Sequence, residues 1–297
     1  MVARGVAVEQ AIGFGLEYVV CNLCGGEATR PFAQRGGMQV VQCAGCGLVY
    51  VNPRRDAESI YQHYNSGQSS RIQYYLDVEV ADRRTFDDIL DLAERLAPQR
   101  GDLLDIGPNI GTCLALARAR GWSTYGVEIN ADAARYCREQ RNLNVVSAAL
   151  DAHTYAENSF DVVLMGDVIE HLRDPLALMR VVHTILKPGG AVIISTPDIA
   201  GWAGRLLQIK PEEHLYYFSP DTISKLLGQA GLELVGVKCL DRYHNLTAMT
   251  HSTTLGGVFQ TLAPAFNLAR RLFGDTVAKL PLRENLLAVA RKPIVVV

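Results

Sequence analysis

The sequence predicts an α/β protein with a nucleotide-binding core, preceded by a small metal-binding module. Residues 102–130 read in order as a buried strand, a glycine-bearing loop, a helix, a second strand and a closing acid. Two Cys-x-x-Cys pairs stand before this unit. Of the 297 residues, 48% are hydrophobic and 20% charged, a composition that supports a large globular core.

The cysteine pairs predict a closed metal site towards the amino-terminal end of the chain. Cys21 and Cys24 form the first pair and Cys43 and Cys46 the second, each followed by a glycine. Four thiolates at this spacing suit a tetrahedral zinc ion with no open position, so we expect a structural zinc and not a catalytic one. A redox-active pair and an iron centre are the alternatives. We expect a zinc ribbon over residues 1–55 whose folding depends on the metal.

A helical linker is expected between this ribbon and the core, over residues 56–100. Apolar residues recur at helical spacing between residues 80 and 97, which predicts a helix packed on the sheet edge. Four tyrosines lie in the polar stretch before it: Tyr61, Tyr64, Tyr74 and Tyr75. We interpret most of them as packing residues, and an aromatic lid over cofactor or substrate is the alternative.

The loop after the first core strand predicts a nucleotide site. Gly107 and Gly111 bracket it, and small residues let a ligand approach the backbone at the amino end of the following helix. Glu128 closes the next strand, where a carboxylate can accept hydrogen bonds from both ribose hydroxyls. The dinucleotide pattern G-x-G-x-x-G fails, because Asn109 and Thr112 stand where it needs glycine. An ordinary α/β turn is the alternative.

The pattern Asp105-x-Gly107-x-Asn109-x-Gly111 resembles the first motif of class I S-adenosylmethionine-dependent methyltransferases, with Asn109 in place of the middle glycine. Asparagine tolerates the left-handed backbone that this position needs. The later segments FDVV, DVIEHLRDP, LKPGG and VIISTP resemble further motifs of that family in order and spacing. The resemblance implies a Rossmann-like, seven-stranded, mostly parallel sheet with helices on both faces.

The resemblance also implies which residues bind S-adenosylmethionine. They follow the carboxyl ends of successive strands, where ligands of open α/β sheets bind. The residues after the third strand would meet the adenine, and those after the fourth the amino-acid part. The implied cofactor-binding residues are Asp105, Gly107, Asn109, Gly111, Glu128, Ile129, Leu150, Asp151, Gly166 and Asp167.

Two histidines are candidates for the catalytic base. Methyl transfer needs alignment and exclusion of water, and a hydroxyl or carbon-acid acceptor also needs a base. His171 follows the fourth strand, and His214 follows the fifth in a segment that shapes the acceptor site in this family. We prefer His214. The alternatives are a capping or packing role for His171, and for His214 a turn before the helix that Ser219 caps.

The last part of the core combines two strands with a long insertion. Strands are expected at residues 232–240 and 284–291, the second of them antiparallel and next to the first. We expect the core to span residues 101–297, with a helical insertion at about 241–283. Its weak apolar stripe consists of Val258, Leu262, Leu268 and Leu272. A cover for the acceptor site or a homodimer contact is favoured, and a patch for a lipid-linked substrate is the alternative.

The net charge and the length of the apolar runs limit where the protein can be located and which partners it can bind. The net charge of −2 and the absence of a basic face argue against nucleic acid as substrate. No apolar run reaches membrane-spanning length, and no signal peptide is recognised. The odd, scattered cysteines outside the two pairs fit a reducing compartment, so we expect a cytoplasmic protein.

These observations favour an S-adenosylmethionine-dependent methyltransferase that acts on oxygen or carbon of a small molecule. The amino-terminal ribbon resembles that of some bacterial sugar methyltransferases, which implies a sugar, nucleotide sugar or related hydroxylated metabolite as acceptor. Those enzymes carry a further carboxyl-terminal domain for which this chain is too short. The alternatives are an inactive methyltransferase-like scaffold on a zinc ribbon and, less favoured, a nicotinamide-dependent oxidoreductase.

Overall fold

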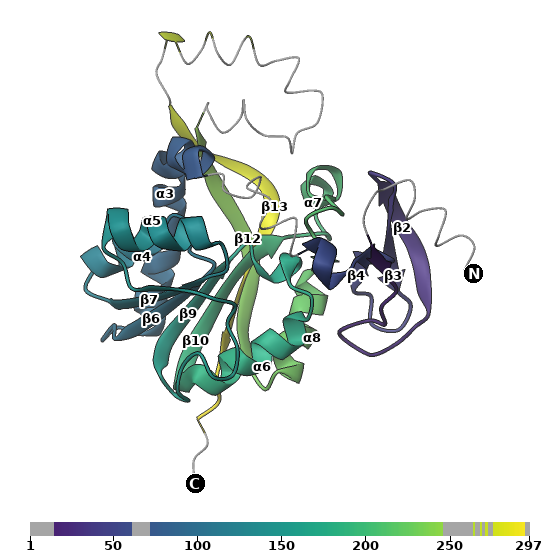
Figure 1. Ribbon diagram of the computed structural model, residues 1–297, viewed down its shortest axis with the longest axis horizontal. Coiled ribbons are helices and arrows are strands. Elements are labelled where there is room, and N and C mark those ends of the chain that lie inside the picture. Colours follow the sequence, from purple (N-terminus) through teal and green to yellow (C-terminus); the bar gives the residue numbers. More distant parts are fainter. Residues whose placement is uncertain are drawn as a thin grey trace.

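A seven-stranded sheet forms the centre of the protein (Figure 1). The computed structural model describes residues 15–60, 72–245, 264, 268, 271–272 and 276–294. In spatial order the sheet contains β12 (Glu233–Asn245), β13 (Val277–Arg291), β10 (Leu186–Pro197), β9 (Phe160–Gly166), β6 (Asp102–Ile106), β7 (Ser123–Glu128) and β8 (Val145–Ser147). β13 runs antiparallel to both neighbours, whereas the strands from β10 to β8 are parallel. The predicted fold class is confirmed.

Helices cover both faces of this sheet (Figure 1). One face carries α3 (Ile72–Leu96), α4 (Thr112–Ala119) and α5 (Ala131–Arg141), and the other carries α6 (Pro175–Ile185) and α8 (Pro220–Gln229). Alternate strand residues therefore enter different cores. Leu103 packs with α3 and α4, whereas its neighbour Leu104 packs with α6 and α8. Burial on both sides explains why the parallel strands are almost continuously apolar.

The linker helix packs chiefly on β12, the edge strand of the sheet, as expected, and extends over the sheet face beside it. α3 packs beside α4 and across β12, β13 and β10. Its apolar stripe of Ile89, Leu90 and Ala93 is buried in the same core as the strand residues of that face, which holds it there. Tyr74 and Tyr75 lie on this helix in edge-to-face contact, with ring centroids 5.3 Å apart. Tyr61 and Tyr64 fall outside the described residues.

The last two strands are longer than expected. β12 and β13 pair from Glu233 opposite Arg291 to Asn245 opposite Val277, with two register shifts on the way. Both strands therefore enter the range expected for the insertion. Of the predicted apolar stripe, Leu268 and Leu272 are exposed, while Val258 and Leu262 fall outside the described residues. No helix in the described part of the chain has the length and apolarity that a membrane crossing requires.

The amino-terminal module, residues 15–55, is joined to the core by strand pairing. Its four-stranded sheet has the order β11 (Tyr216–Tyr217), β4 (Val49–Val51), β3 (Met38–Cys43) and β2 (Thr29–Arg35). β1 (Leu16–Glu17) pairs with β5 (Arg54–Arg55) in a separate ladder. β11 belongs to the segment between β10 and α8, so the core itself supplies the edge strand of the module.

Candidate active site and metal centre

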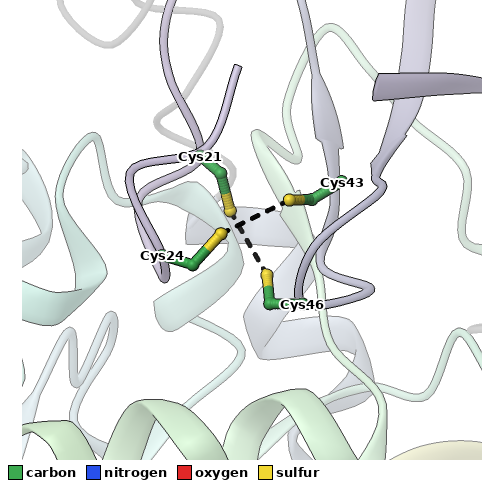
Figure 2. Close-up of side chains that lie close together, drawn as sticks. All are labelled: Cys21, Cys24, Cys43 and Cys46. Atoms are coloured by element: carbon green, nitrogen blue, oxygen red, sulfur yellow. Dashed lines mark hydrogen bonds between the residues drawn. The ribbon is translucent and has the colours of Figure 1, made fainter. Parts of the chain in front are cut away.

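The four cysteine sulfurs of the module point towards one another (Figure 2). The Sγ atoms of Cys21 and Cys46 are 3.4 Å apart, and those of Cys24 and Cys43 are 3.5 Å apart. Disulfides need about 2.05 Å, so these are free thiols. Sulfurs bound at about 2.3 Å to a tetrahedral ion lie about 3.8 Å from one another. The four residues therefore fit such an ion with little adjustment.

The surroundings of these thiols favour a bound cation. Burial opposes ionisation of Cys43, but backbone N–H groups of Cys46 and Gly45 donate to its sulfur and lower its pKa to about 7. Burial raises the pKa of the Cys21 thiol well above its usual value. A cation bound among the four sulfurs would stabilise the thiolate form of Cys21, which burial alone disfavours.

The loop between β6 and α4 has a left-handed backbone at three positions. Gly107, Asn109 and Gly111 have φ values of 73°, 52° and 77°. Asn109 thus adopts the conformation expected at the glycine position that it fills, which asparagine does more readily than most residues. Its N–H donates to Oε2 of Glu128 at 3.0 Å, which fastens the loop to the end of β7.

Glu128 fits the ribose-binding role. Its other oxygen, Oε1, accepts the N–H of Asn130 at 2.8 Å, and burial raises the pKa of the carboxyl despite these bonds. Each oxygen keeps a second lone pair that a ribose hydroxyl can use. The next residue, Ile129, is 59% exposed and offers an apolar surface beside the carboxylate. The geometry of this strand end suits the sugar and base of a nucleoside.

Leu150 and Asp151 lie beyond β8. Leu150 is half-buried, whereas Asp151 is exposed. Oδ1 of Asp151 accepts the N–H of His153 at 2.8 Å and the hydroxyl of Thr154 at 2.9 Å, and these bonds lower the pKa of Asp151. The carboxylate thus closes its own turn. Contact of these two residues with adenine stays a prediction.

The ends of β6 and β9 bring together acids that the sequence predicted and partners that it did not. Asp105 is buried at the end of β6, and burial together with the charge of Glu128 raises its pKa to about 8. Asp167 follows Gly166 with a left-handed φ of 53°.

Two side chains from late strands hold Asp167 in place, besides Ser195 of β10, whose hydroxyl donates to Oδ1 at 3.4 Å. Arg242 of β12 forms an ion pair with it, and Asn285 of β13 donates to its Oδ1 at 3.0 Å. Sequence reasoning missed both partners. They lie far along the chain in strands without a recognisable motif, and only the position of β12 and β13 in the sheet brings them here.

Both candidate bases and one further acid converge at the carboxyl end of β9. Glu170 and His171 lie in the short helix η1 (Ile169–His171), and His214 precedes β11. One ligand atom from each of the three lies within 4.8 Å of the others. The two imidazole rings meet edge to face, with centroids 4.9 Å apart. The sequence indicated both histidines, but Glu170 was not singled out although it adjoins His171.

Hydrogen bonds fix which nitrogen of each ring carries the proton. Nδ1 of His171 lies 2.8 Å from the carbonyl oxygen of Glu213, and Nδ1 of His214 lies 3.0 Å from that of Gln208. A carbonyl oxygen only accepts, so Nδ1 donates in both rings and Nε2 carries the lone pair of the neutral form. Burial lowers the pKa of both histidines, and that of His214 falls well below its usual value.

Comparison with families and curated proteins gives consistent matches. A family model described as a methyltransferase domain matches residues 78–237. The ubiquinone biosynthesis O-methyltransferase of Ruegeria pomeroyi is 35% identical over 152 residues, which cover 46% of this chain and 61% of that protein. The dimethylglycine N-methyltransferase of Parasynechococcus marenigrum is 30% identical over 199 residues, covering 62% of this chain and 69% of that protein. The chain therefore spans less than two thirds of the ubiquinone-pathway relative.

Comparison with solved structures extends over more of the chain. A SAM-dependent methyltransferase from Archaeoglobus fulgidus matches 74% of this chain and 99% of its own, with a TM-score of 0.50 and 20% identity. A SAM-dependent methyltransferase from Thermotoga maritima matches 77% of this chain and 98% of its own, with a TM-score of 0.51 and 20% identity. At this identity the likeness shows the fold alone.

Proposed function

This chain belongs to the methyltransferase-domain family, and on that premise we propose that it transfers the methyl group of S-adenosylmethionine to a small-molecule acceptor. The matched residues 78–237 include the glycine loop, Glu128 and both candidate histidines. We further propose that zinc is the ion that suits the four cysteines, in a structural role because every position is filled by protein sulfur.

The cofactor supplies a methyl group that is already activated on a sulfonium. In our proposal Glu128 accepts hydrogen bonds from its ribose hydroxyls, and the left-handed backbone around Asn109 lets it approach the loop closely. Asp105 and Asp167 flank the amino-acid part, where a cationic ammonium would favour the ionised form of the buried Asp105. Arg242 and Asn285 act as positioning residues for Asp167.

The observation that carries the acceptor chemistry is the fixed orientation of His171 and His214. A hydroxyl must lose its proton as the new bond to carbon forms, so a group with a lone pair has to lie near it. Both rings donate Nδ1–H to a backbone carbonyl and keep Nε2 for such a role. His214, buried with 5% of its surface exposed, is the better shielded from water and remains our preferred residue.

The acceptor is expected to be small and hydroxylated. The name of one relative indicates transfer to oxygen, and that of another indicates transfer to the nitrogen of dimethylglycine. Neither name indicates a sugar, so a sugar or nucleotide sugar rests on the resemblance of the cysteine module alone. The intact Glu128 and the paired histidines weigh against an inactive scaffold, and the family match weighs against a nicotinamide-dependent oxidoreductase.

The first test is calorimetric titration of the zinc-loaded protein with S-adenosylmethionine, its demethylated product and NAD. We expect binding of the first two and not of NAD. Turnover with a panel of sugars, nucleotide sugars and phenols then identifies the acceptor class. His214→Gln should lower turnover roughly a hundredfold or more with unchanged cofactor affinity. His153→Ala, on an exposed turn, is the matched control, and equal turnover of both variants would rule out His214.

A further inference from the structure

We propose that Glu170, His171 and His214 bind a divalent transition-metal cation, distinct from the ion of the cysteine module. This cation would hold the acceptor oxygen during methyl transfer. The proposal rests on the proposed function and deepens it, because it assigns the acceptor-activating role of the histidines to a metal that they coordinate.

Geometry is the first support. One ligand atom from each of the three side chains lies within 4.8 Å of the others. Nitrogen and oxygen ligands bind such cations at about 2.0–2.2 Å, so ligand atoms around one ion lie about 3 to 4.4 Å apart. The three side chains thus need only a small contraction to share an ion.

The outer hydrogen bonds are the second support. Metal-binding histidines usually donate their other N–H to a carbonyl or carboxylate, which fixes the tautomer and the direction of the ring. His171 and His214 both do so, through Nδ1 to a backbone carbonyl. Glu170 is fixed in the same way, since the hydroxyl of Thr196 donates to its Oε2 at 2.9 Å. This leaves Nε2 of both rings for a metal, and Glu170 offers a carboxylate that also accepts a hydrogen bond from its own backbone N–H.

Charge is the third support. Glu170 is 1% exposed, and none of the described basic side chains forms an ion pair with it. A buried carboxylate without a cationic partner is costly unless it is protonated or binds a metal. Arg242 forms its ion pair with Asp167 instead. A divalent cation between Glu170 and the two histidines would supply the missing charge.

The ligand set indicates the kind of ion and what it does. Two imidazoles and one carboxylate suit manganese, iron, cobalt or zinc better than magnesium, and leave coordination positions open. An acceptor hydroxyl bound at one of them would lose its proton to water more readily. The oxygen then forms its bond to the methyl carbon as the carbon–sulfur bond breaks, and the sulfur leaves as a neutral thioether. A second open position would also suit an acceptor with two neighbouring oxygens.

The test measures metal binding directly. Protein loaded with one equivalent of zinc is dialysed separately against Mn²⁺, Co²⁺ and Zn²⁺, and bound metal is counted. Glu170→Gln, His171→Gln and His214→Gln are compared with Glu212→Gln, an exposed acid two positions from His214. We expect the natural chain and Glu212→Gln to bind one further equivalent, and Mn²⁺ to show nitrogen hyperfine coupling in electron paramagnetic resonance. Each of the three other variants should lose more than about a hundredfold in affinity.

The outcomes separate the two proposals. Retention of the first zinc equivalent and of the circular dichroism spectrum shows that a variant is folded. If none of the three ions binds beyond the first equivalent while methyl transfer proceeds, the metal site is refuted and the proposed function stands. If a second equivalent binds through these residues but S-adenosylmethionine does not bind, the proposed function fails and the metal site stands.

Discussion

Tyr216 lies opposite Tyr50 in the antiparallel pair of β11 and β4, and their ring centroids are 6.2 Å apart. Tyr216 follows closely after His214, and Tyr50 follows closely after Cys46. The cysteine module and the candidate acceptor site are therefore connected through one short strand. Arg54 adds a second link, because its Nη1 donates to the Tyr216 hydroxyl at 3.0 Å and to the Arg173 carbonyl at 2.9 Å.

Loss of the cysteine-bound metal should reduce turnover without abolishing cofactor binding. In Cys24→Ser/Cys43→Ser the module should lose its fold, and with it the pairing of β4 to β11 that positions His214. Misplacement by about 1 Å costs on the order of a hundredfold in rate. Turnover and calorimetry with S-adenosylmethionine check this, with Cys239→Ser as control. Full activity of a metal-free double variant would contradict the link.

Glu128→Gln should weaken S-adenosylmethionine binding. A carboxylate that accepts from two ribose hydroxyls contributes charge-assisted bonds of about 1.5–3 kcal/mol, so we expect roughly a tenfold to hundredfold rise in Kd. Glu139→Gln, on the exposed side of α5, is the control, because it makes the same change of charge away from the loop. Calorimetric titration measures both. Equal affinities would show that the ribose binds elsewhere.

Substitutions of Asn109 should separate backbone strain from side-chain chemistry. At its φ of 52°, glycine is free of strain, whereas the β-branched valine loses about 1–2 kcal/mol in the left-handed region. Asn109→Gly should therefore preserve stability and cofactor binding, and Asn109→Val should lower the free energy of unfolding. Urea unfolding and calorimetry measure the two effects. Loss of cofactor binding in Asn109→Gly would instead assign a direct contact to the asparagine side chain.

The sequence predicted those parts of the fold and site that local patterns encode. The glycine loop, the acid at the end of β7 and the four clustered cysteines each carry their chemistry within a few residues. Contacts between distant segments could not be predicted, since no local pattern records them. Arg242 reaches Asp167 only because β12 and β13 add to the sheet beside β10, and β11 joins the module only through its pairing with β4.

Asp105 should make stability depend on pH. Its pKa rises from 3.8 to about 8 on folding, chiefly through burial. Below pH 3.8 the carboxyl is protonated in both the folded and the unfolded state, so it does not lower the free energy of unfolding. As the pH rises through this window the unfolded state ionises first, so stability falls, and the loss is complete above pH 8. Asp105→Asn should remove this loss and gain at least about 1.4 kcal/mol relative to the natural chain between pH 5 and 8.

Urea unfolding of both proteins at several pH values between 5 and 8 measures this difference. The difference should grow steadily as the pH rises. A difference independent of pH would mean that Asp105 ionises in the folded protein much as it does in the unfolded chain.

The ion pair between Arg242 and Asp167 should be energetically coupled. Their side chains are 23% and 32% exposed, so the pair lies between surface pairs and fully buried ones. We expect a coupling energy of about 1–3 kcal/mol from a double-mutant cycle of Arg242→Leu, Asp167→Asn and the combined variant. Urea unfolding of the natural chain and of the three variants provides the four free energies. Arg180→Leu, on the exposed surface of α6, controls for loss of positive charge.

The same cycle also tests the positioning role. If Arg242 acts only by holding Asp167, Arg242→Leu should raise the Kd for S-adenosylmethionine in the natural background but not in the Asp167→Asn background. A positioning residue has no effect once the group that it positions has lost its charge. Equal weakening in both backgrounds would mean that Arg242 contacts the cofactor or acceptor itself. Arg242 would then be a binding residue and not a positioning residue.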